Sequence, residues 1–198
     1  MAKVEPIRDK KKITTIINLL KGKENWRDYV LFVLGINFGL RIGDLLRVQV
    51  KNVREDSGYI KDSFEIKEQK TGKYNSIEIN QAAKETLELL FEKTKIGENP
   101  TNYLIYNTQS YPLGSEAISR VQAYRLIRKW CKQVGLTSLN IGTHTLRKTF
   151  GYHAWKNGIN IEALQEKFKH ESTSTTREYL GIEKKDVKET YHSLDDIF

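Results

Sequence analysis

Apolar side chains recur every three or four positions over most of the chain, so the protein is predicted to be mainly helical. In the first such stretch, Ile13, Ile16 and Leu20 share one face of a helix. Gly135 and Gly158 stand where two of the helices should end. The predicted helices cover residues 12 to 21, 25 to 39, 81 to 95, 115 to 135, 143 to 158, 160 to 170 and 174 to 181.

The apolar period changes to two between residues 63 and 80, which indicates a β-hairpin around the turn "KTGK". The residues on its apolar face are Phe64, Ile66, Ile77 and Ile79. A further short strand is predicted at 103 to 106, "YLIY". Because no repeat or long linker interrupts the pattern, the fold class is one mainly α-helical domain with a small β-hairpin or three-stranded sheet.

Charge and composition narrow the possible partners and compartment. The 198 residues include 33 Lys and Arg but 25 Asp and Glu, a net charge of +8 that suits a polyanion such as nucleic acid without proving one. A single cysteine, Cys131, rules out an internal disulfide and cysteine ligation of zinc. The longest apolar run, "YVLFVLGINFGL", is too short to cross a bilayer, so we expect no membrane partner and a cytoplasmic, reducing location.

The stretch "THTLRKTFGYHAW" offers candidate chemistry. His144 and Arg147 are three residues apart in the first turn of a predicted helix, where unpaired backbone N–H groups favour an anion such as phosphate. The alternative is structural, with His144 packed in the core and Arg147 paired with an acid. An isolated H-x-x-R pattern does not decide between them.

A second candidate is the arginine in "FGLRIGDLLRVQV". Arg41 emerges from the end of an apolar helix, where its guanidinium must either be paired or face a ligand. Asp44 is then either its structural ion-pair partner or a brace that holds a phosphate-binding Arg41 in place.

Six residues together carry a resemblance to a known family. They are Arg41 in "GLRIGDLL", Lys70 in "EQKTGK", His144 and Arg147 in "HTLRKT", His170 in "FKHES" and Tyr179 in "TREYLG". Their order resembles that of the tyrosine recombinases, as do the spacing of three positions from His144 to Arg147 and the spacing of nine positions from His170 to Tyr179. The chain is therefore similar to a phage-type integrase catalytic domain, whose fold, site-specific recombinase activity and DNA partner it is expected to share.

The resemblance implies a way to break a phosphodiester without metal. Tyr179 attacks the scissile phosphate and forms a 3′-phosphotyrosyl bond, while Arg41 and Arg147 bind the nonbridging oxygens. A 5′ hydroxyl of another strand then recovers the stored bond energy. This scheme needs other recombinase protomers on the DNA.

The remaining roles also come from the resemblance. It selects Lys70 as the general acid for the departing 5′ oxygen, although Lys67 and Lys73 lie nearby on the same hairpin. His144 assists proton movement at the tyrosine, and His170 hydrogen-bonds the phosphate. No nucleotide-binding loop and no H-x-x-x-H pair occurs, so we expect neither a cofactor nor a metal ion.

The sequence departs from the family at a few points. Lys169 replaces a usual glycine before the second histidine, and Lys148 replaces a frequent histidine after Arg147. The catalytic domain is expected at 1 to 181, with the N-terminal core-binding domain absent, which fits either an excised fragment or a minimal recombinase. The apolar residues of the tail at 182 to 198 should pack either on their own core or on a neighbouring protomer.

Two other functions stay open at this point. A topoisomerase-like enzyme uses the same chemistry to relax DNA without exchanging partners, and synapsis of two duplexes distinguishes the recombinase from it. A basic DNA-binding module without turnover is the third reading. Against that reading, no position of the catalytic set is lost.

Overall fold

The computed structural model describes residues 3–182, so nearly all of the predicted tail at 182 to 198 lies outside the described part. The chain divides into two compact units, Met1–Phe150 and Gly151–Phe198, with the boundary inside helix α7 (Thr145–Lys156). No helix in the described part is long and apolar enough to cross a membrane.

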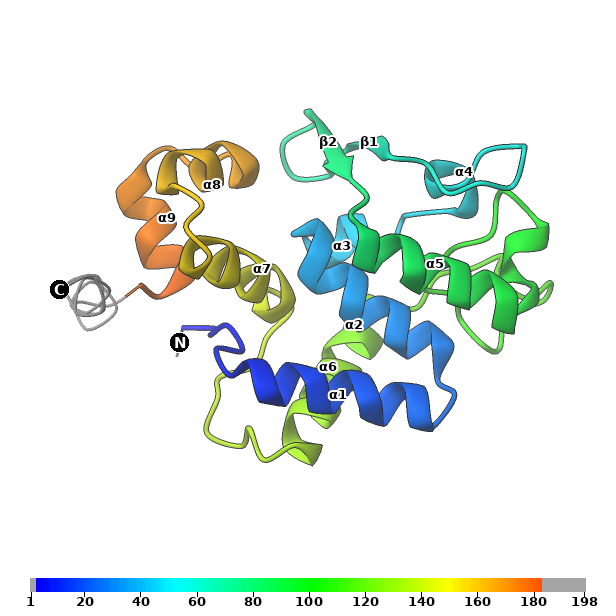
Figure 1. The fold of residues 1–198 in the computed structure, drawn as a ribbon, viewed down its shortest axis with the longest axis horizontal. Helices are drawn as coiled ribbons and strands as arrows, with labels where there is room; N and C mark the ends of the chain where they lie inside the picture. Colours follow the sequence, from blue (N-terminus) through cyan, green and yellow to red (C-terminus); the bar gives the residue numbers. More distant parts are fainter. Residues whose placement is uncertain (1–2, 183–198) are drawn as a thin grey trace, which may run out of the picture. The chain divides into compact units, whose positions relative to one another are not determined.

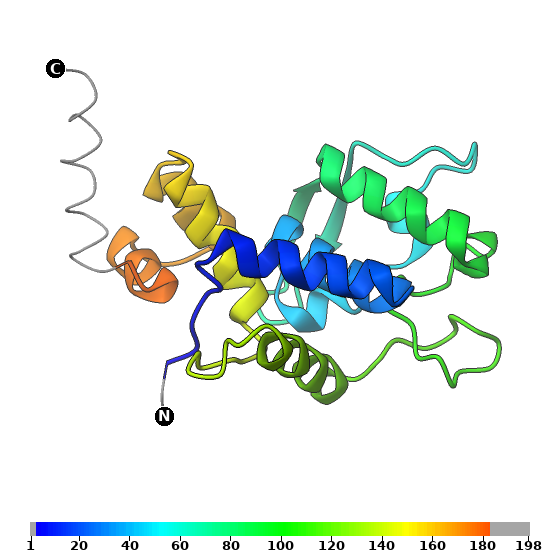
Figure 2. The same ribbon diagram turned by 60° about the horizontal axis from the view of Figure 1, so that its bottom comes forward.

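Helix α2 (Trp26–Phe38) forms the centre of the first unit. It is apolar nearly all round and contacts α1 (Lys10–Gly22), α5 (Gln81–Lys93) and α6 (Arg120–Gln133), which surround it in Figures 1 and 2. The rings of Phe32 on α2 and Trp130 on α6 meet edge to face with centroids 5.9 Å apart. Burial of α2 on every side explains its continuous apolar run.

Helix α6 begins five residues later than predicted, at Arg120. The Ser119 side chain accepts a hydrogen bond from the Gln122 N–H, and the Gln122 side chain bonds back to the Ser119 N–H, so a capping box sets this start. Before the cap, Ile118 donates its N–H to the Ile105 carbonyl at 3.0 Å. Residues 115 and 116 form a bend and Ala117 forms an isolated bridge to Tyr106, so this stretch pairs with another segment instead of starting the helix.

The predicted hairpin is confirmed as the antiparallel strands β1 (Ser63–Lys67) and β2 (Tyr74–Glu78). Phe64 pairs with Ile77 in a register whose inner residues are buried and outer residues exposed.

The strand predicted at 103 to 106 is wrong, because the sheet has two strands in the described part of the chain. Tyr103 and Tyr106 form isolated bridges to Gln49 and Ala117, so the run connects two different segments.

Three short elements were not predicted, because each has only four residues and so is too short to show a helical period. They are α3 (Ile42–Leu45), α4 (Val50–Val53) and the 3-10 helix η1 (Lys95–Glu98).

The N-terminal segment fastens the start of α7. Ile7 donates its N–H to Thr149 Oγ1 at 2.9 Å, and Lys148 Nζ donates to the Val4 carbonyl at 2.8 Å. Lys148, which stands where the family often has histidine, is thus a buried structural lysine.

The second unit contains α8 (Ile161–Phe168), α9 (Thr173–Leu180) and the end of α7, close to the predicted bounds. Gly151 on α7 permits tight packing, since a Cβ there would lie 2.6 Å from Phe168 Cζ and 2.5 Å from Leu180 Cδ2. Both side chains are fully buried. The short helices α8 and α9 therefore gain their stability from this shared core rather than from length.

Candidate active site

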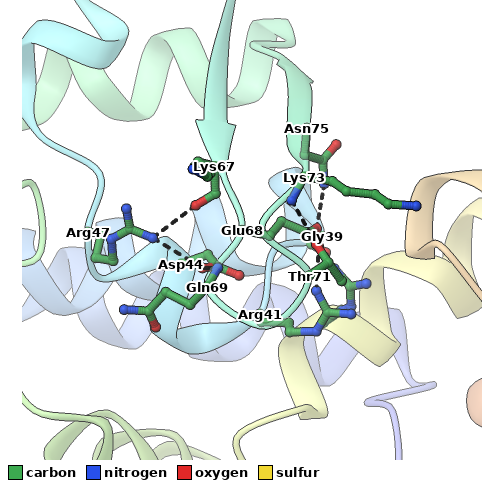
Figure 3. Close-up of polar contacts among 11 residues, drawn as sticks. Gly39, Arg41, Asp44, Arg47, Lys67, Glu68, Gln69, Thr71, Lys73 and Asn75 are labelled. Atoms are coloured by element: carbon green, nitrogen blue, oxygen red, sulfur yellow. Dashed lines mark hydrogen bonds and ion pairs between the residues drawn. The ribbon is translucent and has the colours of Figure 1, made fainter.

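Arg41 lies where the chain leaves α2 and enters α3. Gly39, with φ of 61°, ends α2 in the left-handed conformation and turns the backbone so that Arg41 directly precedes α3. Arg41 Nη1 lies 2.6 Å from Oε2 of Glu68, a carboxylate that is fully buried while the arginine side chain is 19% exposed. Figure 3 shows this ion pair beside the loop of the hairpin.

The side chain of Asp44 contacts the hairpin loop and Arg47 instead of pairing with Arg41. Its side chain is buried, and its Oδ1 accepts the Gln69 N–H at 2.9 Å and lies 3.5 Å from Arg47 Nη1. Asp44 thus holds the hairpin loop, as Figure 3 shows, while Glu68 is the ion-pair partner of Arg41. Asp44 acts on the residue next to Lys70 and not on the arginine itself.

Lys70 lies in the loop that joins β1 and β2, outside either strand. The loop is closed at its base by the Glu68 N–H donating to the Lys73 carbonyl at 3.0 Å and by the Gly72 N–H donating to the Glu68 carbonyl at 2.9 Å. Lys70 is exposed. Its loop position gives the ammonium group access to a ligand that a strand residue on the buried face would lack.

Arg147 is almost fully buried, with 2% exposure, and points back to the end of α2. Its Nη1 donates to the Gly39 carbonyl at 2.6 Å. Gly39 is two residues before Arg41, so this bond draws together the two predicted phosphate-binding arginines, which are far apart in the sequence.

His144 stands in the turn directly before α7, and its carbonyl accepts the Lys148 N–H. Burial lowers the pKa of His144, and the positive charges of Arg147, Arg41, Lys148 and Lys70 lower it further. The imidazole is therefore neutral at pH 7 and able to accept a proton.

Arg41, Asp44, Lys70 and His144 line a pocket of about 390 Å³ in the first unit. Its lining comprises Arg41, Ile42, Gly43, Asp44, Gln69, Lys70, Arg120, Thr143 and His144. Cationic groups gathered in a partly enclosed space suit a phosphate, and the neutral imidazole adds a group that can transfer a proton.

Two residues near this pocket were missed by the sequence reasoning. Glu68 continues the alternation of Phe64 and Ile66, so the period of two already placed its side chain on the buried face. Arg120, which donates to Gln69 Oε1 at 2.6 Å, had no signal beyond the serine cap before it.

In the second unit, the spacing of nine residues brings two predicted residues into contact. The rings of His170 and Tyr179 meet edge to face with centroids 4.8 Å apart, and Phe168 lies 5.5 Å from Tyr179. His170 Nδ1 is 3.1 Å from Oγ1 of the buried Thr176, which orients the imidazole. Tyr179 is half-buried.

The turn between α8 and His170 forms even though glycine is absent. Lys169 adopts φ of 54° and ψ of 45°, and its N–H caps α8 by bonding to the Gln165 and Glu166 carbonyls. The His170 N–H also bonds to the Gln165 carbonyl. The departure from the family pattern therefore leaves the backbone turn intact at a modest cost in strain.

No group of three or more His, Cys, Asp or Glu side chains within residues 3–182 could hold a metal ion. Independence from metal stays a prediction that chelation tests.

Comparison with known proteins identifies relatives over nearly the whole chain. Residues 8–186 match the phage integrase family. The chain is 40% identical over 189 residues to the "Probable integrase/recombinase YoeC" of Bacillus subtilis, covering 95% of each chain. It is 28% identical over 172 residues to the tyrosine recombinase XerC of Thermodesulfovibrio yellowstonii, covering 83% of this chain and 53% of that one.

Solved structures have a similar fold. The crystal structure of XerA recombinase superposes with a TM-score of 0.75 at 18% identity, covering 98% of this chain and 66% of that one. XerH recombinase bound to its difH substrate, in the post-cleavage complex, has a TM-score of 0.70 at 18% identity. The match covers 96% of this chain and 53% of the XerH chain. The chain thus spans nearly all of YoeC and between half and two thirds of the Xer recombinases.

Proposed function

This chain belongs to the phage integrase family, the tyrosine recombinases, and we propose that it breaks and rejoins DNA through a 3′-phosphotyrosyl intermediate. The observation that carries the proposal is the pocket of the first unit, where Arg41, Lys70 and His144 come together beside the buried Arg147. A phosphodiester is a ligand that these groups match in charge and in reactivity.

The chemistry follows from the groups present. The phenol oxygen of Tyr179 bonds to phosphorus as the bond to the 5′ oxygen breaks, so the phosphate moves from one oxygen to the other. The phenol loses a proton, which neutral His144 can accept, and the departing 5′ oxygen takes a proton from Lys70. Arg41 and Arg147 offset the negative charge that builds on the nonbridging oxygens.

Rejoining reverses these steps. A 5′ hydroxyl of a second strand attacks the phosphotyrosine, and tyrosine leaves with its proton restored. Because the number and kind of phosphoester bonds are unchanged, strand exchange needs no ATP. Two duplexes held together by several protomers distinguish this recombination from topoisomerase-like relaxation, in which the original strand is rejoined.

The test is trapping of a covalent adduct on a nicked duplex that carries a candidate attachment site, read on a denaturing gel. Wild-type protein should form the adduct, and Tyr179→Phe should form none while keeping the ring contacts of Tyr179 with Phe168 and His170. Tyr111→Phe, at a side chain that is 97% exposed, is the matched control and should react like wild type. An adduct formed by Tyr179→Phe would rule out this nucleophile.

A second arm of the test separates this enzyme class from metal-dependent nucleases. Cleavage should persist in excess chelator, because arginines take the place that magnesium has in nucleases. Loss of cleavage that magnesium restores would contradict the proposal.

The proposal also includes partners and location. Double-stranded DNA and other protomers bound to it are the partners, and a net charge of +8 supports the first of these. We place the reaction in the cytoplasm. Burial raises the pKa of the single thiol, Cys131, to about 11, which makes it an unreactive core residue.

A further inference from the structure

Glu68 is a buried carboxylate at the edge of the pocket, and none of the assigned roles uses it. Its side chain has no exposed surface, although it stands at the start of an exposed loop. A buried charge is costly unless all its hydrogen bonds are made. The buried charge of Glu68 is therefore expected to have hydrogen-bond donors for both of its oxygens, or a role in function.

The hydrogen bonds of Glu68 reach three different segments. Its Oε2 accepts from Arg41 Nη1 at 2.6 Å and from Thr71 Oγ1 at 3.0 Å, and its Oε1 accepts from Asn75 Nδ2 at 2.9 Å. Burial alone would raise the pKa of Glu68, but the hydrogen bonds from Asn75, Arg41 and Thr71 outweigh it and lower the pKa. The carboxylate is therefore ionised at neutral pH and held from several sides.

We propose that Glu68 is a positioning residue that couples the phosphate-binding arginine, Arg41, to the loop that carries the general acid, Lys70. The inference rests on the proposed function, since it assumes those two roles. One carboxylate oxygen joins Arg41 to Thr71, the residue next to Lys70, and the backbone of Glu68 closes the base of the same loop. Movement of the loop therefore moves the guanidinium, and a phosphate that fixes Arg41 also fixes the loop.

The geometry favours such a brace over competition with the phosphate. Within residues 3–182, Glu68 is the acceptor for the Arg41 guanidinium and uses Nη1 alone, which leaves the Nε and Nη2 donors for two nonbridging contacts. Asn75 and Thr71 hold the carboxylate from its other sides. A fixed carboxylate orients the guanidinium before DNA binds, which reduces the ordering needed in the transition state.

The first experiment compares Glu68→Gln with Glu65→Gln, which removes the same charge from an exposed position on the outer face of β1. Adduct formation on the nicked duplex at saturating protein should be about 10- to 100-fold slower for Glu68→Gln, as for other residues that orient a site group. Glu65→Gln should react like wild type. If Glu68→Gln reacts as fast as Glu65→Gln, Glu68 does not position Arg41. If Glu68→Gln reacts faster, Glu68 competes with the phosphate for Arg41.

The second experiment uses altered substrates to separate positioning from a general loss of structure. A 5′-bridging sulfur leaves without a general acid and should relieve a Lys70→Ala defect, whereas a methylphosphonate removes one negative charge and should relieve an Arg41→Ala defect. The Glu68→Gln defect should shrink on both substrates. Relief by only one of them, or by neither, overturns the coupling.

The third experiment does not depend on activity, so it separates failure of this inference from failure of the proposed function. Amide hydrogen exchange is measured in residues 69 to 73 of the folded protein without DNA. Both Arg41→Ala and Glu68→Gln should speed exchange at Gln69 and Gly72, while Glu65→Gln should not. Unchanged loop exchange in Arg41→Ala overturns the coupling whether or not any variant cleaves DNA.

Discussion

The two units build their parts of the chemistry in opposite ways. In the first unit the bonds that gather the site span long stretches of sequence, 27 residues from Arg41 to Glu68 and 108 from Gly39 to Arg147. In the second unit His170 is oriented by Thr176, six residues away, and meets Tyr179 across one turn and one helix. The proposed phosphate-binding site is thus a product of tertiary folding, while the proposed nucleophile, Tyr179, and His170 are placed by local structure.

This difference has an energetic consequence. Arg147 is buried and satisfies a backbone carbonyl, so its change should affect stability and chemistry together. Tyr179 is half-buried, and its phenol can be altered while its ring contacts remain. Variants in the first unit should therefore lose stability and activity together, while variants in the second unit can lose activity and keep stability.

The largest combined loss of stability and chemistry is expected for Arg147→Lys, which keeps the charge but removes the planar fork. Adduct formation should fall about 10²- to 10³-fold, as for loss of a donor to a developing oxyanion. The free energy of unfolding should fall by about 1–3 kcal/mol because the Gly39 carbonyl loses its partner. Adduct kinetics and chemical denaturation measure the two losses, with Arg177→Lys at an exposed position of α9 as control. If Arg147→Lys loses only adduct formation or only stability, the expected link between the two is wrong.

A smaller effect, mainly on the chemistry, is expected for Thr176→Val, which removes the hydroxyl beside His170 Nδ1 but keeps the shape. Adduct formation should slow about 10-fold because the imidazole is no longer oriented, while stability changes by about 1 kcal/mol. Thr173→Val makes the same change at the start of α9 and should leave the rate unaltered. Equal rates for both variants would show that Thr176 does not orient His170.

The pH dependence of stability should show separate contributions from two residues of the first unit, His144 and Glu68. Because the folded protein lowers the pKa of His144, the unfolded chain takes up its proton first, and stability should begin to fall as the pH drops below about 6.5. The pKa of Glu68 is also lowered, so its contribution is lost only as the pH falls further, below about 4.5. Melting temperatures across this range measure both steps. His144→Gln should remove the upper step and Glu68→Gln the lower one, and a variant that removes neither contradicts the assignment.

The smallest effect is expected for Lys169→Gly in the second unit. Relief of the left-handed conformation should raise the free energy of unfolding by about 1 kcal/mol. Gly158→Ala, with φ of 92° and no atom within 4 Å of a built Cβ, should lower it by a similar amount through the backbone alone. Denaturant midpoints check both signs. If Lys169→Gly destabilises the protein, the lysine side chain contributes more than its backbone costs.

Local patterns determined much of this protein. The helical period predicted the long helices, and the period of two predicted the hairpin. The same period is consistent with the burial of Glu68, although Glu68 was not singled out from the sequence. The segment from His170 to Tyr179, nine positions apart, holds one turn and one helix, so the contact of these two residues is a property of that segment. Short-range spacing was sufficient because each of these features involves neighbours in the chain.

Tertiary structure decided the features that depend on distant segments. The run at 103 to 106 has the composition of a strand but forms isolated bridges, since its backbone groups pair with separate partners. The sequence offered Asp44, three residues away, as the partner of Arg41, yet the fold supplied Glu68 through the hairpin loop and directed Asp44 to Gln69. A charged side chain pairs with whichever group packing brings within reach, and spacing along the chain determines that only where the partners share one element.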